Sequence, residues 1–187
     1  MTVEALRNIY QIKATLVGIK PPIWRRLLVS STMVLDEFHE ALQIVMGWTN
    51  NHLHQFIANG EYFGMPDPEF EFDCKDESKV KLNKLFCAEH DAILYEYDFG
   101  DGWEHKIVLE KIHPFEKDVP LPVCKKGKRS CPPEDCGGIW GYQDFLDIIQ
   151  DSSHAEYEET MEWIDGEFDP ESFDIEEVNS ILAEYCR

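Results

Sequence analysis

Residues Tyr95–Ile107 read YEYDFGDGWEHKI, and this stretch predicts a β-hairpin around which the rest of the chain is organised. Aromatic residues recur at alternate positions, and the turn signal between them has Gly100 and Gly102 on either side of Asp101. A period of two is typical of a half-buried strand, and glycine supplies the positive φ that short hairpin turns need. We therefore expect two antiparallel strands whose aromatic residues share one face.

The loop length decides which residues of this hairpin face each other. A two-residue turn would pair Asp98 with His105. A three-residue loop, whose last glycine takes the left-handed conformation, would pair Phe99 with Trp103 and Tyr97 with His105. We prefer the three-residue loop because it gathers the aromatic residues on one face. It sends Asp98 to the face opposite His105, whose ring we expect to pack inward and to bond to a neighbour.

Two further strands are predicted near the start of the chain. Residues 9–17 and 23–30 alternate apolar and polar side chains on either side of a turn at 18–22. Because the turn is short, the two strands should pair antiparallel. Arg25 and Arg26 then lie on opposite faces, so one of the two should be exposed.

A helix and another hairpin follow these strands. Ser31 or Thr32 can cap a helix whose apolar residues recur at helical spacing until Gly47, which favours a left-handed end. Residues 52–57 read HLHQFI and predict a third strand, and Asn59–Gly60 is a two-residue turn signal into a short fourth strand. The order strand, strand, helix is a ββα start, as in β-grasp-like folds.

The remaining segments predict loops and helices. Pro, Asp, Glu and Lys dominate residues 65–81, which we interpret as a surface loop ending in a short apolar piece. A connection rich in Pro, Gly and Cys fills residues 114–140. Three helices should follow, one from about Tyr142, one capped by Ser153 and one capped by Asp174. Each of these two capping residues has a glutamate three residues later, which is the pattern of a capping box.

Together these elements predict an α+β fold. It should have the ββα, β-grasp-like start, a mixed or antiparallel sheet that includes the hairpin 93–112, and C-terminal helices packed on that sheet. A chain of 187 residues is long enough to bury one core. We expect one domain over residues 1–187, with a sheet core at about 9–113, the Cys/Pro/Gly loop at 114–140 and an acidic helical part at 141–187.

The charge distribution limits the partners that the protein can have. The net charge is -20, and residues 130–187 carry 17 Asp or Glu against one Lys or Arg. Such a field repels phosphates, so direct binding to nucleic acid is unlikely by charge. No apolar run approaches the roughly 18 residues that span a bilayer, and the start MTVEALRNIY lacks the character of a signal peptide. We expect a cytoplasmic protein without a membrane partner.

Histidines and cysteines offer candidate metal ligands. His52 and His54 are two apart on a predicted strand, so both rings can point the same way, although edge hydrogen bonding explains them as well. Of the six cysteines, Cys131 and Cys136 alone approach the spacing of a zinc knuckle, and their Pro- and Gly-rich surroundings equally indicate a rigid backbone. The metal hypothesis takes its ligands from some subset of His54, His105, Cys131 and Cys136, together with Asp101, and the ion is a divalent metal such as zinc.

Four motifs in order resemble one family. They are the strand PPIWRRLLV with its continuation MGWTNNHLHQF, the hairpin YEYDFGDGWEH, the segment RSCPPEDCGGIWGY and the ending EFDPESFDIEEVN. The chain resembles the plasmid pRiA4b ORF-3-like family from about Tyr10 to Leu182. This family is a domain of unknown biochemical function, often found on plasmids or near mobile elements. The resemblance adds Asp98, Gly137 and Gly138 as motif positions and places the candidate site at His54, Asp101, Trp103, His105, Glu134, Asp135 and Tyr142.

Three functions remain open on the sequence alone, and no catalytic residue is assigned. The first is a binding or regulatory module that recognises a protein partner through its acidic helices or its aromatic hairpin. The second is a metal-dependent, hydrolase-like enzyme with a His/Asp/Cys site. The third is a DNA-associated protein of mobile elements, which the acidic charge disfavours. We rank them in this order because no nucleophile and base stand at a recognisable spacing.

Overall fold

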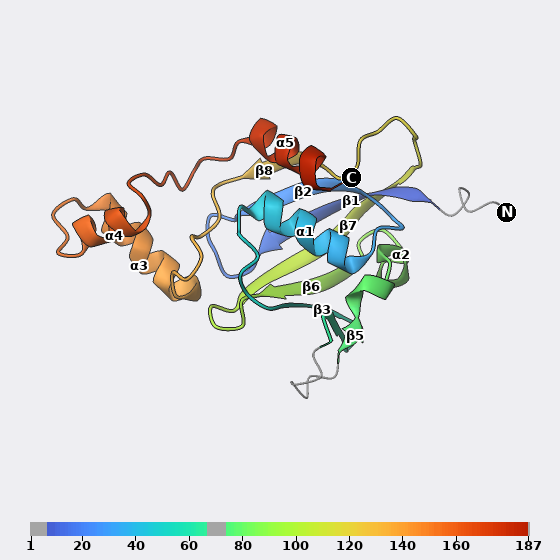
Figure 1. Ribbon diagram of the computed structural model, residues 1–187, viewed down its shortest axis with the longest axis horizontal. Helices are drawn as coiled ribbons and strands as arrows, with labels where there is room; N and C mark the ends of the chain where they lie inside the picture. Colours follow the sequence, from blue (N-terminus) through green and yellow to red (C-terminus); the bar gives the residue numbers. More distant parts are fainter. Residues whose placement is uncertain (1–6, 67–73, 187) are drawn as a thin grey trace.

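A computed structural model describes residues 7–66 and 74–186, which form one eight-stranded sheet with helices against it (Figure 1). The strand order is β5-β4-β3-β6-β7-β1-β2-β8, and every neighbouring pair is antiparallel except β4 and β5. The strands are β1 (Asn8–Leu16), β2 (Trp24–Ser30), β3 (His54–Ala58), β4 (Glu61–Gly64), β5 (Lys75–Asp76), β6 (Ala92–Tyr97), β7 (Trp103–Pro114) and β8 (Val123–Lys128). The α+β fold class and the mixed sheet are thus confirmed.

Five α-helices and a short 3-10 helix complete the described residues. They are α1 (Leu35–Met46), the 3-10 helix η2 (Glu77–Lys79), α2 (Leu82–Leu85), α3 (Gly138–Gln150), α4 (Tyr157–Trp163) and α5 (Ile175–Tyr185). Helix α1 covers the middle of the sheet, α5 lies against β8 and α1, and α3 and α4 lie together to one side (Figure 1). Of the three predicted C-terminal helices, α5 is therefore the one that lies over the sheet. No helix in the described ranges is both long and apolar enough to cross a bilayer.

The ββα start is present, and its core follows from the sequence pattern. Strands β1 and β2 pair in the register Ile12 to Leu27, and both alternate buried with half-buried residues. Arg25 lies on the buried face whereas Arg26 is partly exposed and pairs with Glu110, as the alternation predicted. The likeness to β-grasp folds in particular stays a prediction.

Helix α1 begins later than expected. Its N-cap is Val34 rather than Ser31 or Thr32, because Ser31 Oγ accepts the Asn8 backbone N–H and the Thr32 hydroxyl bonds to Ser30 instead. Its end agrees with the prediction, since Gly47 has φ +87°. The buried stripe of α1 packs on the sheet face that also carries the hairpin aromatics.

The central hairpin is real, but its predicted register was wrong. Tyr97 pairs with Trp103 and Tyr95 with His105, so the loop has five residues, from Asp98 to Gly102, and neither of the two shorter loops forms. The shift equals two residues along one strand, so the same aromatic side chains still share one face. The expected Glu96–Lys106 pair is lost, and Glu96 lies opposite Glu104.

The segments after the hairpin differ most from the sequence prediction. Residues 114–140 contain the edge strand β8, whose CKKGK sequence lacks an apolar alternation because it pairs only with β2. Helix α4 begins at Tyr157 rather than near Ser153, whose hydroxyl donates to Asp151 instead of capping the helix. Asp174 does cap α5 by accepting the N–H groups of its first turn. Of the predicted loop 65–81, residues 67–73 lie outside the described residues.

Candidate functional site

Three segments that are far apart in the sequence meet at the tip of the β6–β7 hairpin. The Asp98 N–H donates to the Leu53 carbonyl at 2.8 Å, and the Asp101 carboxylate accepts the Gly137 N–H at 3.2 Å. The tip, the segment after α1 and the start of α3 consequently lie on the same side of the sheet (Figure 1). These segments carry three of the sequence motifs, so the motifs converge in space.

The tip owes its shape to Asp98. This residue adopts a left-handed backbone with φ +57°, and its carboxylate accepts the N–H groups of Gly100 at 2.9 Å and Asp101 at 3.3 Å. The Gly102 N–H closes the loop by donating to the Asp98 carbonyl at 2.6 Å. Aspartate tolerates the left-handed region better than most residues because its side chain can bond to nearby backbone. The five-residue loop therefore depends on a side chain that the expected register had placed in a strand.

Helix α3 begins in close contact with the tip. Gly138 has φ +69°, and a Cβ atom on it would lie 2.5 Å from the Asp101 carbonyl oxygen. Only glycine fits such an approach without moving the backbone. The Gly137–Gly138 pair of the motif therefore serves to seat α3 against the hairpin.

Glu134 joins the other two segments. One carboxylate oxygen accepts the Tyr97 hydroxyl at 2.5 Å, and the other accepts the backbone N–H of Thr49 at 3.1 Å as well as the Thr49 hydroxyl. Burial raises the pKa of Tyr97 well above its ordinary value, and the Glu134 carboxylate adds to that rise. Tyr97 therefore stays protonated and donates to Glu134 at neutral pH.

His52 lies between two carboxylates. Its Nδ1 is 3.7 Å from the Asp98 carboxylate and its Nε2 is 3.2 Å from the Asp135 carboxylate. One ligand atom from each residue falls within 4.8 Å of the other two, and no other such trio of His, Cys, Asp or Glu occurs in residues 7–66 and 74–186. We call His52, Asp98 and Asp135 the tip cluster. It offers one imidazole and two carboxylates, a set that divalent ions accept.

His54 points elsewhere, so the expected His52–His54 pair does not form. Strand β3 begins only at His54, and the strand alternation that would align the two rings does not reach His52. The His54 ring stacks on His39 with centroids 3.4 Å apart, and its Nε2 is 2.9 Å from the buried Glu77 carboxylate. Burial, and secondarily the charge of His54, lowers the pKa of His39 to about 3. These two rings therefore lie in the interior, where His39 bonds to Tyr95 and Asn50 and His54 bonds to Glu77.

His105 and Trp103 lie in the core rather than on an open surface. His105 is fully buried, its Nδ1 lies 3.1 Å from the Trp103 carbonyl, and burial lowers its pKa to about 4. The ring packs against Trp48 and Tyr95. His105 Nε2 and Trp103 Nε1 have no hydrogen-bond partner among the described residues. Both residues thus behave as packing residues, in agreement with the inward face predicted for His105.

Cys131 and Tyr142 are also buried, and Cys136 is half-buried. Cys131 Sγ lies 3.4 Å from an Arg25 guanidinium nitrogen and 3.6 Å from the Met46 sulfur. Burial raises the pKa of Cys131 to about 11, and burial with the Asp101 charge raises that of Cys136 to about 12. Metal ligation requires the thiolate, which these surroundings disfavour. Tyr142 is buried too, with a pKa raised to about 12 by burial.

Around the tip, large apolar side chains reach solvent. Trp140 is 83% exposed on the first turn of α3, Phe99 is 45% exposed in the hairpin loop, and Leu53 is exposed beside Asp98. We call these three residues the tip surface. The segments that carry these residues touch one another, because the Asp98 N–H donates to the Leu53 carbonyl and Gly138 approaches the Asp101 carbonyl.

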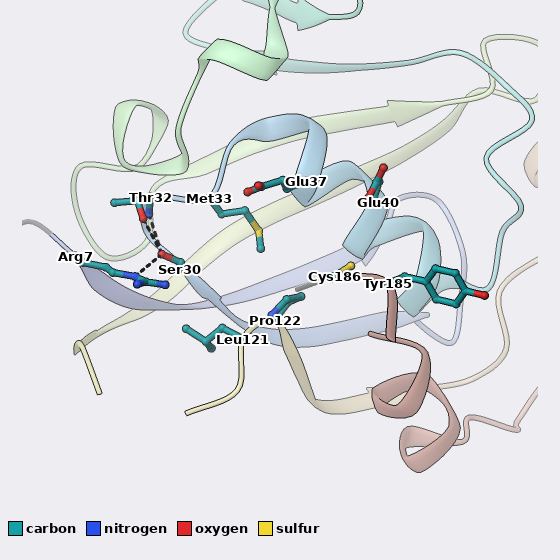
Figure 2. Close-up of a pocket in the computed structure, with 10 residues that line it drawn as sticks. All are labelled: Arg7, Ser30, Thr32, Met33, Glu37, Glu40, Leu121, Pro122, Tyr185 and Cys186. Atoms are coloured by element: carbon teal, nitrogen blue, oxygen red, sulfur yellow. Dashed lines mark hydrogen bonds between the residues drawn. The ribbon is translucent and has the colours of Figure 1, made fainter. Parts of the chain in front are cut away.

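A separate hollow of about 550 Å³ lies between β2, α1 and the end of α5 (Figure 2). Arg7 donates to the Ser30 hydroxyl at 3.2 Å on one side, whereas Tyr185 points away on the other. Glu37 and Glu40 line it from α1. Its charged groups do not converge on one point, and none of the predicted site residues lines it.

The sequence analysis thus found part of this site. Asp101, Glu134 and Asp135 lie at the tip as the motifs indicated, whereas His54, Trp103, His105 and Tyr142 are interior. His52 was noted but paired with the wrong histidine, and Thr49 was missed. The signal for Thr49 was its place in the motif MGWTNNHLHQF, two residues after the helix-ending Gly47, where a polar residue can contact another loop.

Comparisons with known proteins agree on one family. The family model for the plasmid pRiA4b ORF-3-like protein matches residues 8–177. The uncharacterized protein y4hQ of Sinorhizobium fredii (strain NBRC 101917 / NGR234) is 39% identical over 157 residues, which are 83% of this chain and 80% of that protein. The crystal structure of MM3350, a protein of unknown function from Methanosarcina mazei Go1, matches with a TM-score of 0.82 and 39% identity over 91% of this chain and 97% of that one.

Proposed function

The chain belongs to the plasmid pRiA4b ORF-3-like family, as its motifs predicted, and we propose that it acts as a binding module for a protein partner. The observation that carries this proposal is Trp140, which is 83% exposed and follows Gly138, the residue at which α3 contacts the hairpin tip, by two positions. Tryptophan is enriched among the residues that dominate binding energy at protein interfaces. A role beside plasmids or other mobile elements stays a prediction.

The surroundings of Trp140 indicate the chemistry of the partner. Phe99 and Leu53 supply further apolar area, and the carboxylates of Asp98, Asp101 and Asp135 lie next to them. An apolar centre with a charged rim is the usual anatomy of a protein interface. Because the neighbouring charges are negative, a basic segment is the complementary partner.

Site-specific photo-crosslinking tests this proposal. A photoreactive phenylalanine analogue at Phe99 or Trp140 should capture one discrete partner in the producing cells, which mass spectrometry would identify. Tyr62 provides a matched control, because it is 44% exposed but lies on β4, far from the tip along β3. Equal capture at position 62, or no discrete product at 99 and 140, would count against the tip surface as an interface.

A divalent metal site is the second candidate function, because the tip cluster brings one imidazole and two carboxylates together. Two ligands of one tetrahedral zinc ion are separated by about 3.4 Å, so the cluster must contract slightly to hold an ion. The Asp135 side chain is 71% exposed, which favours moderate rather than tight binding because water competes for the ion. The hydrolase-like reaction of the sequence hypothesis stays a prediction, with the tip cluster in place of the buried thiols.

Calorimetric titration of chelator-treated protein with Zn²⁺ and Mn²⁺ tests the metal site. We expect one saturable site that Asp135→Asn weakens at least tenfold, since a ligating carboxylate is lost. Asp144→Asn is the matched control, because Asp144 is an exposed acid on α3 outside the tip cluster. If both variants bind like the wild type, or if the wild type takes up no ion, the metal hypothesis is wrong.

Direct DNA binding remains the third candidate function. The net charge of -20 opposes contact with phosphates, and the basic run at 125–129 is partly used, since Arg129 pairs with Glu171 and donates to the Pro21 carbonyl. We therefore retain it only as a prediction from the genomic setting of the family.

A further inference from the structure

A second hollow is lined in part by the loop that carries Glu134. It has a volume of about 370 Å³ and opens between the end of α1, residues 131–134 and the segment 163–168 at the end of α4. We call it the α4 pocket. Its size falls in the range of pockets that hold organic ligands or single large side chains, about 300 to 1,000 Å³. None of the proposals above uses it.

Aromatic side chains form its walls. Trp163 is 49% exposed and packs its ring edge-on to Phe145, with centroids 6.0 Å apart. Phe168 packs against the same ring at 5.1 Å. On the opposite wall Trp48 stacks on Tyr97 at 5.0 Å, and its Nε1 donates to the Pro132 carbonyl. Neighbouring contacts therefore orient all three rings that line the pocket.

The charged side chains that line the α4 pocket are all acidic. Glu134 and Glu167 contribute carboxylates, and no Lys, Arg or His of the described ranges 7–66 and 74–186 lines the pocket. Glu134 receives hydrogen bonds from a tyrosine and a threonine, which are neutral, so its negative charge is not cancelled by them. The surrounding segment adds to the field, because residues 151–177 contain 12 Asp or Glu and no Lys or Arg.

Aromatic faces and carboxylates favour the same kind of ligand. The face of an indole or phenyl ring is negative and attracts a cation placed over it. A guanidinium group suits such a site better than an ammonium ion, since it is planar, stacks on rings and donates to a carboxylate in a fork. A neutral apolar ligand would instead bring two carboxylates next to hydrocarbon without compensation.

We propose that the α4 pocket is a guanidinium-binding site that receives an arginine side chain of the protein partner. This inference deepens the proposed function and rests on it for the source of the arginine. The loop 131–136 lines the α4 pocket with Glu134 and supplies Asp135 to the tip cluster, so one basic segment that lies along this loop can contact both. The occupant is thus an arginine in a basic segment, whose positive charge is complementary to the negative charge of the tip.

Titration of the full chain with a small arginine probe tests the site directly. The probe is N-acetyl-arginine methylamide, and N-acetyl-citrulline methylamide is its neutral isostere. NMR signals of the tryptophan indole N–H groups report on the pocket, because Trp48 and Trp163 both line it. We expect a saturable shift of these two signals with the arginine probe and a much weaker response to the citrulline probe.

Charge variants locate the interaction. Glu167→Gln should weaken binding of the arginine probe by about two- to fivefold, the size of one exposed charge contact. Glu162→Gln is the matched control, since Glu162 lies on α4 five residues before Glu167 but does not line the pocket, and it should leave the affinity unchanged. Equal binding of the two probes, equal effects of the two variants, or the absence of a saturable shift would overturn the inference.

The outcomes of the two experiments are independent. If crosslinking at the tip surface captures a partner but the arginine probe does not bind, the pocket assignment fails and the binding module stands. If the probe binds with the expected specificity but no partner is captured, the guanidinium site stands and the proposed protein-binding function fails.

Discussion

Arg25 gives the sharpest test of how the fold holds the candidate site together. Its side chain is buried in the core, with Nε donating to the Val45 carbonyl at 2.6 Å and Nη2 to the Arg129 carbonyl at 2.8 Å. The guanidinium also lies 4.0 Å from the centre of the Phe173 ring. A single side chain thereby connects the end of α1, the end of β8 and the segment before α5.

Replacement of Arg25 by methionine keeps an apolar stem of similar length but removes every donor. The Val45 carbonyl belongs to the last turn of α1, where the helix itself supplies no partner, because the Thr49 N–H is taken by Glu134. Two buried carbonyls without donors cost roughly 1–3 kcal/mol each, and loss of the contact with Phe173 adds about 1 kcal/mol. Avoiding the desolvation of a cation offsets part of this cost, so we expect a net loss of about 3 kcal/mol.

Equilibrium urea unfolding followed by far-ultraviolet circular dichroism measures this loss. Arg26→Met is the matched control, because Arg26 is the next residue, is partly exposed and has the carboxylate of Glu110 as its partner. Its replacement should cost less than about 1 kcal/mol, as exposed ion pairs do. Were the two variants to lose the same free energy of unfolding, the reasoning about the buried carbonyls would be refuted.

Two further predictions concern the tip and the core. Gly138→Ala should lower the free energy of unfolding, measured with urea, by at least about 2 kcal/mol, since the new Cβ meets the Asp101 carbonyl. The control Gly102→Ala has open space around its new Cβ and should cost only about 1 kcal/mol. Equal losses in the two variants would contradict the close approach of Gly138 to Asp101. His39 and His105 have folded-state pKa values of about 3 and about 4, below the ordinary 6.5, so the unfolded chain binds more protons. Their contribution to stability is complete above pH 6.5 and is lost as the pH falls towards 4, by about 1.4 kcal/mol per pH unit for each histidine near pH 5. His105→Gln should reduce the slope of unfolding free energy against pH by about one proton, and an unchanged slope would show that His105 does not titrate this way.

The sequence predicted those elements whose signal is local. Strands β1 and β2 alternate along most of their length, so the pattern alone placed Arg25 and Arg26 on opposite faces with one of them exposed, and the structure shows that Arg25 is the buried one. The left-handed end of α1 at Gly47 and the cap of α5 at Asp174 likewise depend on single residues and their neighbours. Strand β8 has no such signal, because a strand at the edge of the sheet with one paired side does not need alternating apolar residues.

The hairpin register shows where local reasoning ends. Turn rules favoured two or three residues between the strands, but Asp98 adopts a left-handed backbone and bonds its carboxylate to the loop, which creates a five-residue connection. The aromatic face was nevertheless predicted correctly, because a shift of two residues preserves the side of every side chain. The position of Asp98 was predicted wrongly, because this residue lies in the loop rather than in the strand and its carboxylate faces His52.

The candidate site depends on contacts that no local pattern encodes. The loop 131–136 is attached to the rest of the protein through Trp48, which donates to the Pro132 carbonyl, and through Thr49, which donates to Glu134. Both residues directly follow the end of α1, so the helix end as well as the hairpin determines where Asp135 lies relative to His52. A binding site assembled from three segments in this way cannot be read from the hairpin alone. The hairpin presents Asp98 and Phe99, and the end of α1, anchored by Arg25, supports the loop that completes the cluster and forms one wall of the α4 pocket.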